Sequence, residues 1–175
     1  MRASEDMIKR LATTPNNPYR TAMREVLKDP ASQMPPVLYA LANALSEDYP
    51  EEGVFWYHVA RLRAVYDGLR CRDVTSRHVV TLLGKNLSLP LRQAQFYHRD
   101  TLVATAEKAI AWDEKNPRNY DQRWITLFGD VAKTSDGADP AALFLPESEW
   151  PGILKQVHDT HLQSVREFAF EKKGK

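Results

Sequence analysis

The feature that most constrains the fold is the spacing of apolar residues after Pro50. Over residues 54–70 they recur in steps of four and three, at Phe55, Val59, Leu62, Tyr66 and Leu69. This spacing places them on one face of an α-helix. Because proline is favoured in the first turn of a helix, Pro50 also indicates where the helix begins. The sequence therefore predicts a long helix that ends near residue 70.

The segment before Pro50 carries a second apolar stripe. Over residues 36–48 the stripe consists of Val37, Leu38, Leu41, Ala42 and Leu45. Tyr49 and Pro50 leave room only for a very short turn between the two segments. Short connections make consecutive helices antiparallel neighbours, so we expect a helical hairpin over residues 36–70.

Glycine and proline usage extends the helical prediction to the rest of the chain. The sequence holds only 7 glycines, and its 11 prolines often stand where a helix would start. Weaker apolar patterns predict further helices over residues 4–13, 18–28, 74–87, 101–114, 118–132 and 147–172. Residues 133–145 lack periodicity and are predicted as a surface loop, and residues 172–175 as a flexible tail. We expect an all-α, single-domain bundle over residues 1–175, with about six to eight helices, a central hairpin and a long C-terminal helix.

Composition excludes several classes of protein. The net charge of +1 makes nucleic-acid binding an unfavoured function, because such proteins usually carry a basic face. The single cysteine excludes an internal disulfide and a thiolate zinc cluster. No apolar stretch reaches the roughly 18 residues of a membrane span, and charges interrupt the segment after Met1 where a signal peptide would be apolar. We therefore expect a cytoplasmic protein, or a periplasmic one if a signal peptide has been removed.

Polar residues gather on and just after the predicted helix over residues 54–70. The candidate binding residues are His58, Arg61, Arg63, Tyr66, Asp67, Arg70 and Asp73. Guanidinium groups can bind a carboxylate or phosphate through two hydrogen bonds, so one interpretation is an arginine-lined anion pocket. The other is a structural face, because Arg63–Asp67 and Asp67–Arg70 have ion-pair spacing on a helix. We favour the structural interpretation and keep the pocket as the alternative.

Catalytic and metal-binding patterns are weak. Cys71 lies between two arginines and could be a reactive thiol if it were exposed, but a nucleophile also needs a positioned base. His158 and His161 have a spacing at which two histidines can face one ion, yet His161 falls on the apolar stripe of its helix, which indicates a core histidine. The sequence contains no nucleophile-elbow or phosphate-binding glycine loop. We expect no metal and no cofactor, and a protein that is more a binding protein than an enzyme.

Two stretches resemble a known kind of protein. Val54-Phe55-Trp56-Tyr57, followed by Leu62-Arg63 and by Arg70-Cys71-Arg72-Asp73, resembles a pattern in small, uncharacterised all-helical proteins of Gram-negative bacteria. Ala109-Ile110-Ala111-Trp112-Asp113 with Asn116-Pro117 is similar to their second shared stretch. The resemblance implies a helical fold and a bacterial origin. It also implies a role like that of the similar proteins that act as immunity partners of secreted toxins.

Two functions remain open at this point. The first is a non-catalytic bacterial protein that blocks or scaffolds a protein partner, such as a toxin-immunity protein, with Trp or Tyr anchors and an arginine rim at the interface. The second is a protein that binds a small anionic ligand, or an enzyme, which uses the polar cluster from His58 to Asp73. The sequence does not identify the partner, the ligand or the oligomeric state.

Overall fold

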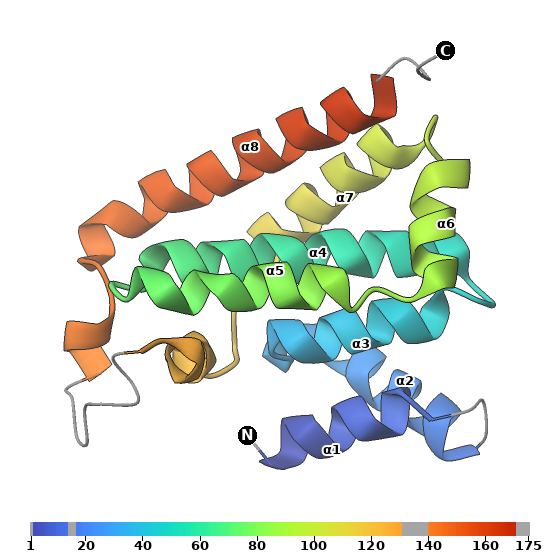
Figure 1. Cartoon of the computed structure of the whole chain (residues 1–175), viewed down its shortest axis with the longest axis horizontal. Helices are drawn as coiled ribbons and strands as arrows, with labels where there is room; N and C mark the ends of the chain where they lie inside the picture. Colours follow the sequence, from blue (N-terminus) through green and yellow to red (C-terminus); the bar gives the residue numbers. More distant parts are fainter. Residues whose placement is uncertain (1, 14–16, 131–139, 171–175) are drawn as a thin grey trace.

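The computed structural model describes residues 2–13, 17–130 and 140–170, and this part of the chain is helical apart from turns and one isolated bridge. The central element is α4 (Pro50–Arg70). Figure 1 shows α3 (Pro35–Leu45) on one side of α4, and α7 (Leu102–Lys115) and α8 (Trp150–Phe170) on the other. The predicted all-α bundle with a long C-terminal helix is confirmed.

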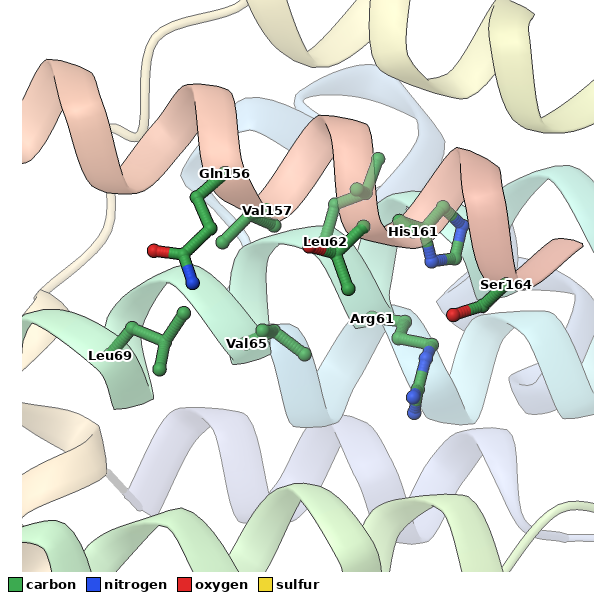
Figure 2. Close-up of a pocket in the computed structure, with 9 residues that line it drawn as sticks. Arg61, Leu62, Val65, Leu69, Gln156, Val157, His161 and Ser164 are labelled. Atoms are coloured by element: carbon green, nitrogen blue, oxygen red, sulfur yellow. The ribbon is translucent and has the colours of Figure 1, made fainter.

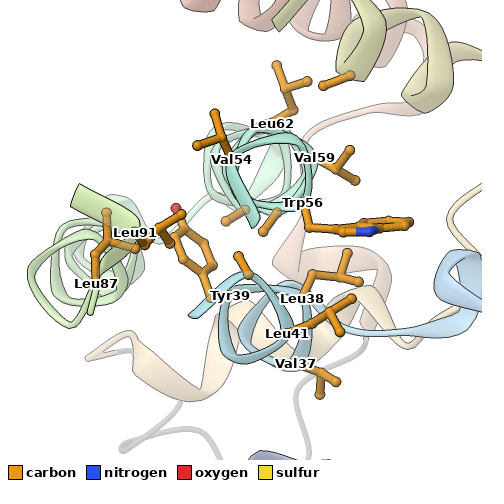
Figure 3. Packing of buried hydrophobic residues seen from close by; sticks show 14 of the residues in the cluster. Val37, Leu38, Tyr39, Leu41, Val54, Trp56, Val59, Leu62, Leu87 and Leu91 are labelled. Atoms are coloured by element: carbon orange, nitrogen blue, oxygen red, sulfur yellow. The ribbon is translucent and has the colours of Figure 1, made fainter. Parts of the chain in front are cut away.

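The hairpin of α3 and α4 forms the centre of the core. Pro35, Pro36 and Pro50 occupy first-turn positions, where the missing N–H would have no partner within the helix. The packed side chains include Val37, Leu38, Leu41, Val54, Val59 and Leu62 (Figure 3). The two backbones lie close together, since a Cβ on Gly53 would stand 3.0 Å from the carbonyl oxygen of Ala42. The predicted hairpin over residues 36–70 is confirmed.

The first two helices cover the outer side of α3. They are α1 (Arg2–Leu11) and α2 (Asn17–Lys28), and both contact α3. Leu11 and Val26 are buried there, as expected for the inner faces of short amphipathic helices. A 3₁₀ turn over Pro30–Ser32 leads into α3.

Two short helices lie beside α4. The predicted helix over residues 74–87 is a 3₁₀ turn (Val74–Arg77) that leads into α5 (His78–Lys85). The following α6 (Leu89–Tyr97) was not predicted. Its start is marked by Ser88, whose hydroxyl accepts a hydrogen bond from the backbone N–H of Leu91, followed by a proline in the first turn. Leu91 packs beside Tyr39 of α3 (Figure 3).

The prediction of a helix over residues 118–132 is wrong in type and extent. Residues 122–128 form a 3₁₀ helix, η3 (Gln122–Phe128), and residues 118–121 are not helical. Pro117 disfavours the helical conformation for Asn116, which is extended. The backbone N–H of Asn119 then donates to the carbonyl oxygen of Ala31 at 3.1 Å. These contacts, together with the burial of Tyr120, hold the segment against the core instead of in a helix.

The segment before α8 is fastened to the end of α4. Residues 133–139 of the predicted surface loop lie outside the described residues, as do residues 131–132 of the predicted helix over 118–132 and the predicted tail over 172–175. Residues 140–143 form a 3₁₀ turn, and Phe144 pairs with Cys71 in an isolated antiparallel bridge. The N–H of Leu145 donates to the carbonyl oxygen of Arg70 at 2.8 Å. This part of the predicted loop is therefore bound to the core, and it sets where α8 begins.

Candidate functional site

The polar side chains of α4 are mostly buried, although the sequence places them among ordinary helix residues. His58, Arg63, Asp67 and Arg70 each keep 1% or less of their surface exposed. Charged groups are almost never fully buried unless they are paired. The partners of each side chain therefore decide whether it is structural or available to a ligand.

Arg63 belongs to a structural network between α4 and α7. Its Nε donates to Oδ1 of Asp113 at 3.0 Å, and its two other nitrogens donate to the carbonyl oxygens of Ala31 and Asn116. The second carboxylate oxygen of Asp113 accepts from Arg118 and lies 3.1 Å from Nε2 of His158. Burial alone would raise the pKa of Asp113, but the hydrogen bond from His158 and the charges of Arg118 and Arg63 lower it overall.

A second network fills the end of α4. Asp67 accepts hydrogen bonds from Arg70 at 3.0 Å, from the hydroxyl of Tyr120 at 3.0 Å and from the indole N–H of Trp124 at 2.8 Å. Arg70 also donates to Gln122. Burial raises the pKa of Asp67, and the nearby Arg70 opposes part of that rise. This network attaches η3 to α4.

The remaining residues at this end of the predicted cluster are structural as well. The guanidinium of Arg70 lies 4.5 Å from the ring centroid of Tyr66, and that of Arg118 lies 4.4 Å from it. Asp73 is the N-cap of the 3₁₀ turn before α5, where its Oδ1 accepts from the N–H of Thr75 at 3.0 Å. Five of the seven predicted residues therefore have structural contacts: Arg63, Asp67 and Arg70 connect elements, Tyr66 packs against two guanidinium groups, and Asp73 caps a turn.

The other two predicted residues, His58 and Arg61, lie at a hollow between α4 and α8 to which α5, α6 and α7 also contribute one residue each. Nδ1 of His58 is 3.0 Å from Nε2 of His161, which comes from α8. The two imidazole rings meet edge to face, with centroids 5.0 Å apart. Figure 2 shows His161 directed from α8 toward α4, and Arg61 extending from α4.

The hollow has two compartments that share Arg61, His161 and Ser164 as walls. The larger compartment has a volume of about 370 Å³, and its other walls are Tyr57, His58, Gly84, Gln95, Leu102, Val165 and Phe168. This volume lies within the range of about 300–1,000 Å³ typical of small-molecule sites. The smaller compartment, of about 130 Å³, follows the groove between α4 and α8 and is lined further by Leu62, Val65, Leu69, Gln156, Val157 and Thr160. We call these two compartments the α4–α8 pocket.

Arg61 is the cation of this pocket. It makes no ion pair with any carboxylate in the described part of the chain, unlike Arg63 and Arg70 on the same helix. Across the described lining there is no Asp, Glu or Lys. Arg61 lies near Tyr39, where burial raises the pKa of the tyrosine and the guanidinium opposes part of that rise. The pocket therefore contains one positive charge that no described carboxylate neutralises.

The two histidines of the pocket are neutral at pH 7. Burial lowers the pKa of His161 to about 4, and Arg61 and His158 add to this effect. Burial also places the pKa of His58 well below its usual value, with further contributions from His161 and Arg61. In a neutral pair one ring donates to the other. The pair then keeps one N–H for another acceptor, either on Nε2 of His58 or on Nδ1 of His161.

The buried Nε2 of His58 has no hydrogen-bond partner among the residues that the structure describes. Buried polar atoms nearly always have a partner, so such an atom at the wall of a pocket is consistent with a site for a bound group.

Sequence reasoning found His58 and Arg61 but missed the rest of the pocket. His161 was weighed only as a metal ligand or a core histidine, and Tyr57, Gln95 and Ser164 were not considered as site residues. The inward position of His161 on its apolar stripe was the one available signal. Within residues 2–13, 17–130 and 140–170, no group of three or more His, Cys, Asp or Glu side chains could hold a metal ion.

A cluster of exposed aromatic side chains lies next to the larger compartment. Tyr97 is 75% exposed, and Phe96 and Phe168 are exposed to a lesser degree. The guanidinium of Arg99 lies 5.7 Å from the ring of Phe96 and 4.8 Å from the ring of Phe168. We call Phe96, Tyr97, Arg99 and Phe168 the aromatic patch; it joins the ends of α6 and α8, and its Phe168 also lines the pocket.

Comparisons of this chain with protein-family models, with curated proteins and with solved structures found no match. The resemblance to small helical bacterial proteins therefore stays a prediction. None of the helices in the described residues is both long enough and apolar enough to cross a membrane.

Proposed function

We propose that this protein binds a small organic anion in the α4–α8 pocket, with Arg61 as the residue that binds the negative group. The observation that carries the proposal is the contrast between the arginines of α4. Arg63 and Arg70 are buried against carboxylates, whereas Arg61 faces a pocket without an acidic residue in its described lining. The buried histidine pair beside Arg61 supplies an N–H donor for the same group.

The pocket also supports binding in preference to hydrolysis or metal chemistry. Its described lining contains no carboxylate that could act as a general base and no cysteine, and its two histidines hydrogen-bond to each other. Ser164 is its one serine, and it has no hydrogen bond to a histidine in the described residues. A nucleophile within hydrogen-bond reach of its base is the usual sign of covalent catalysis.

The test measures thermal unfolding of the full chain with acetate, octanoate and inorganic phosphate at increasing concentrations. A ligand present at 100 times its Kd stabilises the folded state by about 2.7 kcal/mol, which corresponds to a rise in Tm of about 5–10 °C for a protein of this size. The Arg61→Gln variant should lose most of the response, because a hydrogen-bonded charge contributes about 1.5–3 kcal/mol. That loss is about 10–100-fold in affinity.

Arg123→Gln is the matched control. Arg123 is an exposed arginine whose ion pair with Asp121 lies on η3. Its removal should leave the response to anions unchanged. An equal rise in Tm in wild type and Arg61→Gln would contradict the proposal. It would also be contradicted if none of the three anions raised the Tm.

A second candidate function is protein binding through the aromatic patch. Aromatic residues and arginine are the residue types that most often dominate binding energy at interfaces, and the patch combines three exposed aromatic rings with Arg99. This arrangement supports the hypothesis of a protein that blocks or scaffolds a partner, but it does not identify an immunity role. A pull-down from the native host should capture a partner with wild type and lose it with Tyr97→Ser. Capture of the same partner by both proteins would count against this surface.

A further inference from the structure

The two compartments of the α4–α8 pocket differ in chemistry. The larger one presents Tyr57, Gln95 and the histidine pair around Arg61. The smaller one follows α4 away from Arg61, and its inner wall consists of Leu62, Val65, Leu69 and Val157 (Figure 2). Gln156 and Thr160, both exposed residues of α8, complete this compartment. A ligand that fills both compartments must therefore be polar at one end and apolar at the other.

The charge of the pocket limits the polar end to a single negative charge. Arg61 is the one charged residue in the described lining, and the histidines next to it are neutral because burial lowers the pKa of both. Phosphate monoesters carry about 1.5 to 2 negative charges at pH 7. A carboxylate carries one, and its two oxygens match the two parallel donors of a guanidinium.

The length of the apolar end follows from the helix. Leu69 lies eight residues after Arg61, which corresponds to about 12 Å along the axis of α4. Since a C–C bond is about 1.5 Å and a zigzag chain advances less than this per bond, about eight to ten carbons span that distance.

We propose that the ligand is an amphipathic monocarboxylate of medium chain length. Its carboxylate binds Arg61 and accepts the free N–H of the pair formed by His58 and His161. Its alkyl chain lies between α4 and α8 and reaches toward Leu69. This inference rests on the proposed anion-binding function and adds the class of ligand to it.

The experiment measures Kd by calorimetry for acetate, butyrate, hexanoate, octanoate, 1-octanol and octyl phosphate, all below the concentrations at which they aggregate. Burial of one methylene contributes enough to lower Kd about fourfold. The Kd should therefore fall about 16-fold for each two carbons up to octanoate. Octanol should bind at least tenfold more weakly than octanoate, because it does not provide a negative charge for Arg61.

Two variants separate the ends of the ligand. Arg61→Gln should raise the Kd for octanoate about 10–100-fold, as expected for the loss of a charged hydrogen bond. It should leave the Kd for octanol unchanged. Val65→Phe fills the smaller compartment. It should reduce the affinity for octanoate to near that for butyrate, and it should leave the affinity for acetate unchanged. Val65 is half-buried, and Leu69→Phe serves the same purpose if Val65→Phe does not fold, as judged by its thermal transition.

The outcomes distinguish this inference from the function on which it rests. If anion binding needs Arg61 but does not strengthen with chain length, the inference that the ligand is amphipathic is overturned. The proposed anion-binding function then stays in place. If octyl phosphate binds more tightly than octanoate, the inference that the polar group is a carboxylate is overturned. Octanol binding as tightly as octanoate, with no effect of Arg61→Gln, would overturn both, as would the absence of binding by every compound.

Discussion

Replacement of Arg63 by methionine should destabilise the protein strongly. Methionine keeps much of the apolar stem of arginine but removes the ion pair with Asp113 and the two hydrogen bonds to the backbone of Ala31 and Asn116. Removal of one partner of a buried ion pair costs about 3–5 kcal/mol, because the other charge stays buried. Asp113 keeps Arg118 and His158, so we expect a value at the lower end of this range.

The matched control is Arg61→Met, the same substitution two residues earlier on the same helix. Arg61 is half-buried and forms no ion pair with a described carboxylate, so this variant should change the free energy of unfolding by less than about 1 kcal/mol. Urea denaturation followed by circular dichroism gives the free energy of unfolding for both variants. A loss of about 3–5 kcal/mol corresponds to a decrease in Tm of about 6–20 °C for a chain of this length.

The result that would refute the reasoning is an equal shift in the two variants. Equal shifts would mean that the burial of Arg63 among Asp113, Ala31 and Asn116 contributes no more to stability than an arginine at the wall of a pocket. If only Arg61→Met destabilised the protein strongly, the assignment of the structural network to Arg63 would be wrong.

Two further predictions concern the histidine pair and the contact between α3 and α4. Folding stability should fall as the pH drops from about 6.5 to about 4, because unfolded chains protonate histidine in this window while folded His161, with a pKa of about 4, stays neutral. The loss in the free energy of unfolding due to His161 is about 3 kcal/mol. In urea denaturation, His161→Gln should therefore show a smaller change of midpoint with pH than wild type. An unchanged dependence on pH would contradict the buried neutral pair. Gly53→Ala should cost about 1–3 kcal/mol, since the added Cβ would meet backbone atoms of Ala42 and Ser46 at 3.0–3.1 Å. Gly152→Ala, whose Cβ meets nothing within 4 Å, should instead be neutral or stabilising, and equal melting temperatures of the two variants would refute the close contact.

Local sequence features were sufficient for most of the helices. Pro50 and the apolar steps after it predicted α4, and the stripe over residues 36–48 predicted α3, because first-turn prolines and helical periodicity act within a few residues. Short α6 was missed because its apolar residues span little more than two turns. Residues 118–121 were assigned to a helix because the sequence does not reveal that Tyr120 is drawn to Asp67, 53 positions earlier.

The roles of the polar residues on α4 were decided by the tertiary structure. The sequence located a polar cluster and left two interpretations open, a structural face and an anion pocket. Arg63 and Arg70 belong to structural networks, whereas Arg61 lies at the wall of a pocket. Since each residue of an α-helix turns by about 100°, Arg61 and Arg63 point about 200° apart around the axis of α4. One therefore meets Asp113 of α7, and the other meets the pocket beside α8.

The sequence by itself determined that the chain forms an all-α bundle around a helical hairpin, because helix formation depends on local spacing and capping. It did not determine which arginine pairs with a described carboxylate and which lines a pocket, because that depends on the side chains that α7 and α8 bring to opposite sides of α4. His161 comes from 103 residues further along the chain than His58. Only the packing of α8 on α4 creates the histidine pair and the pocket beside Arg61.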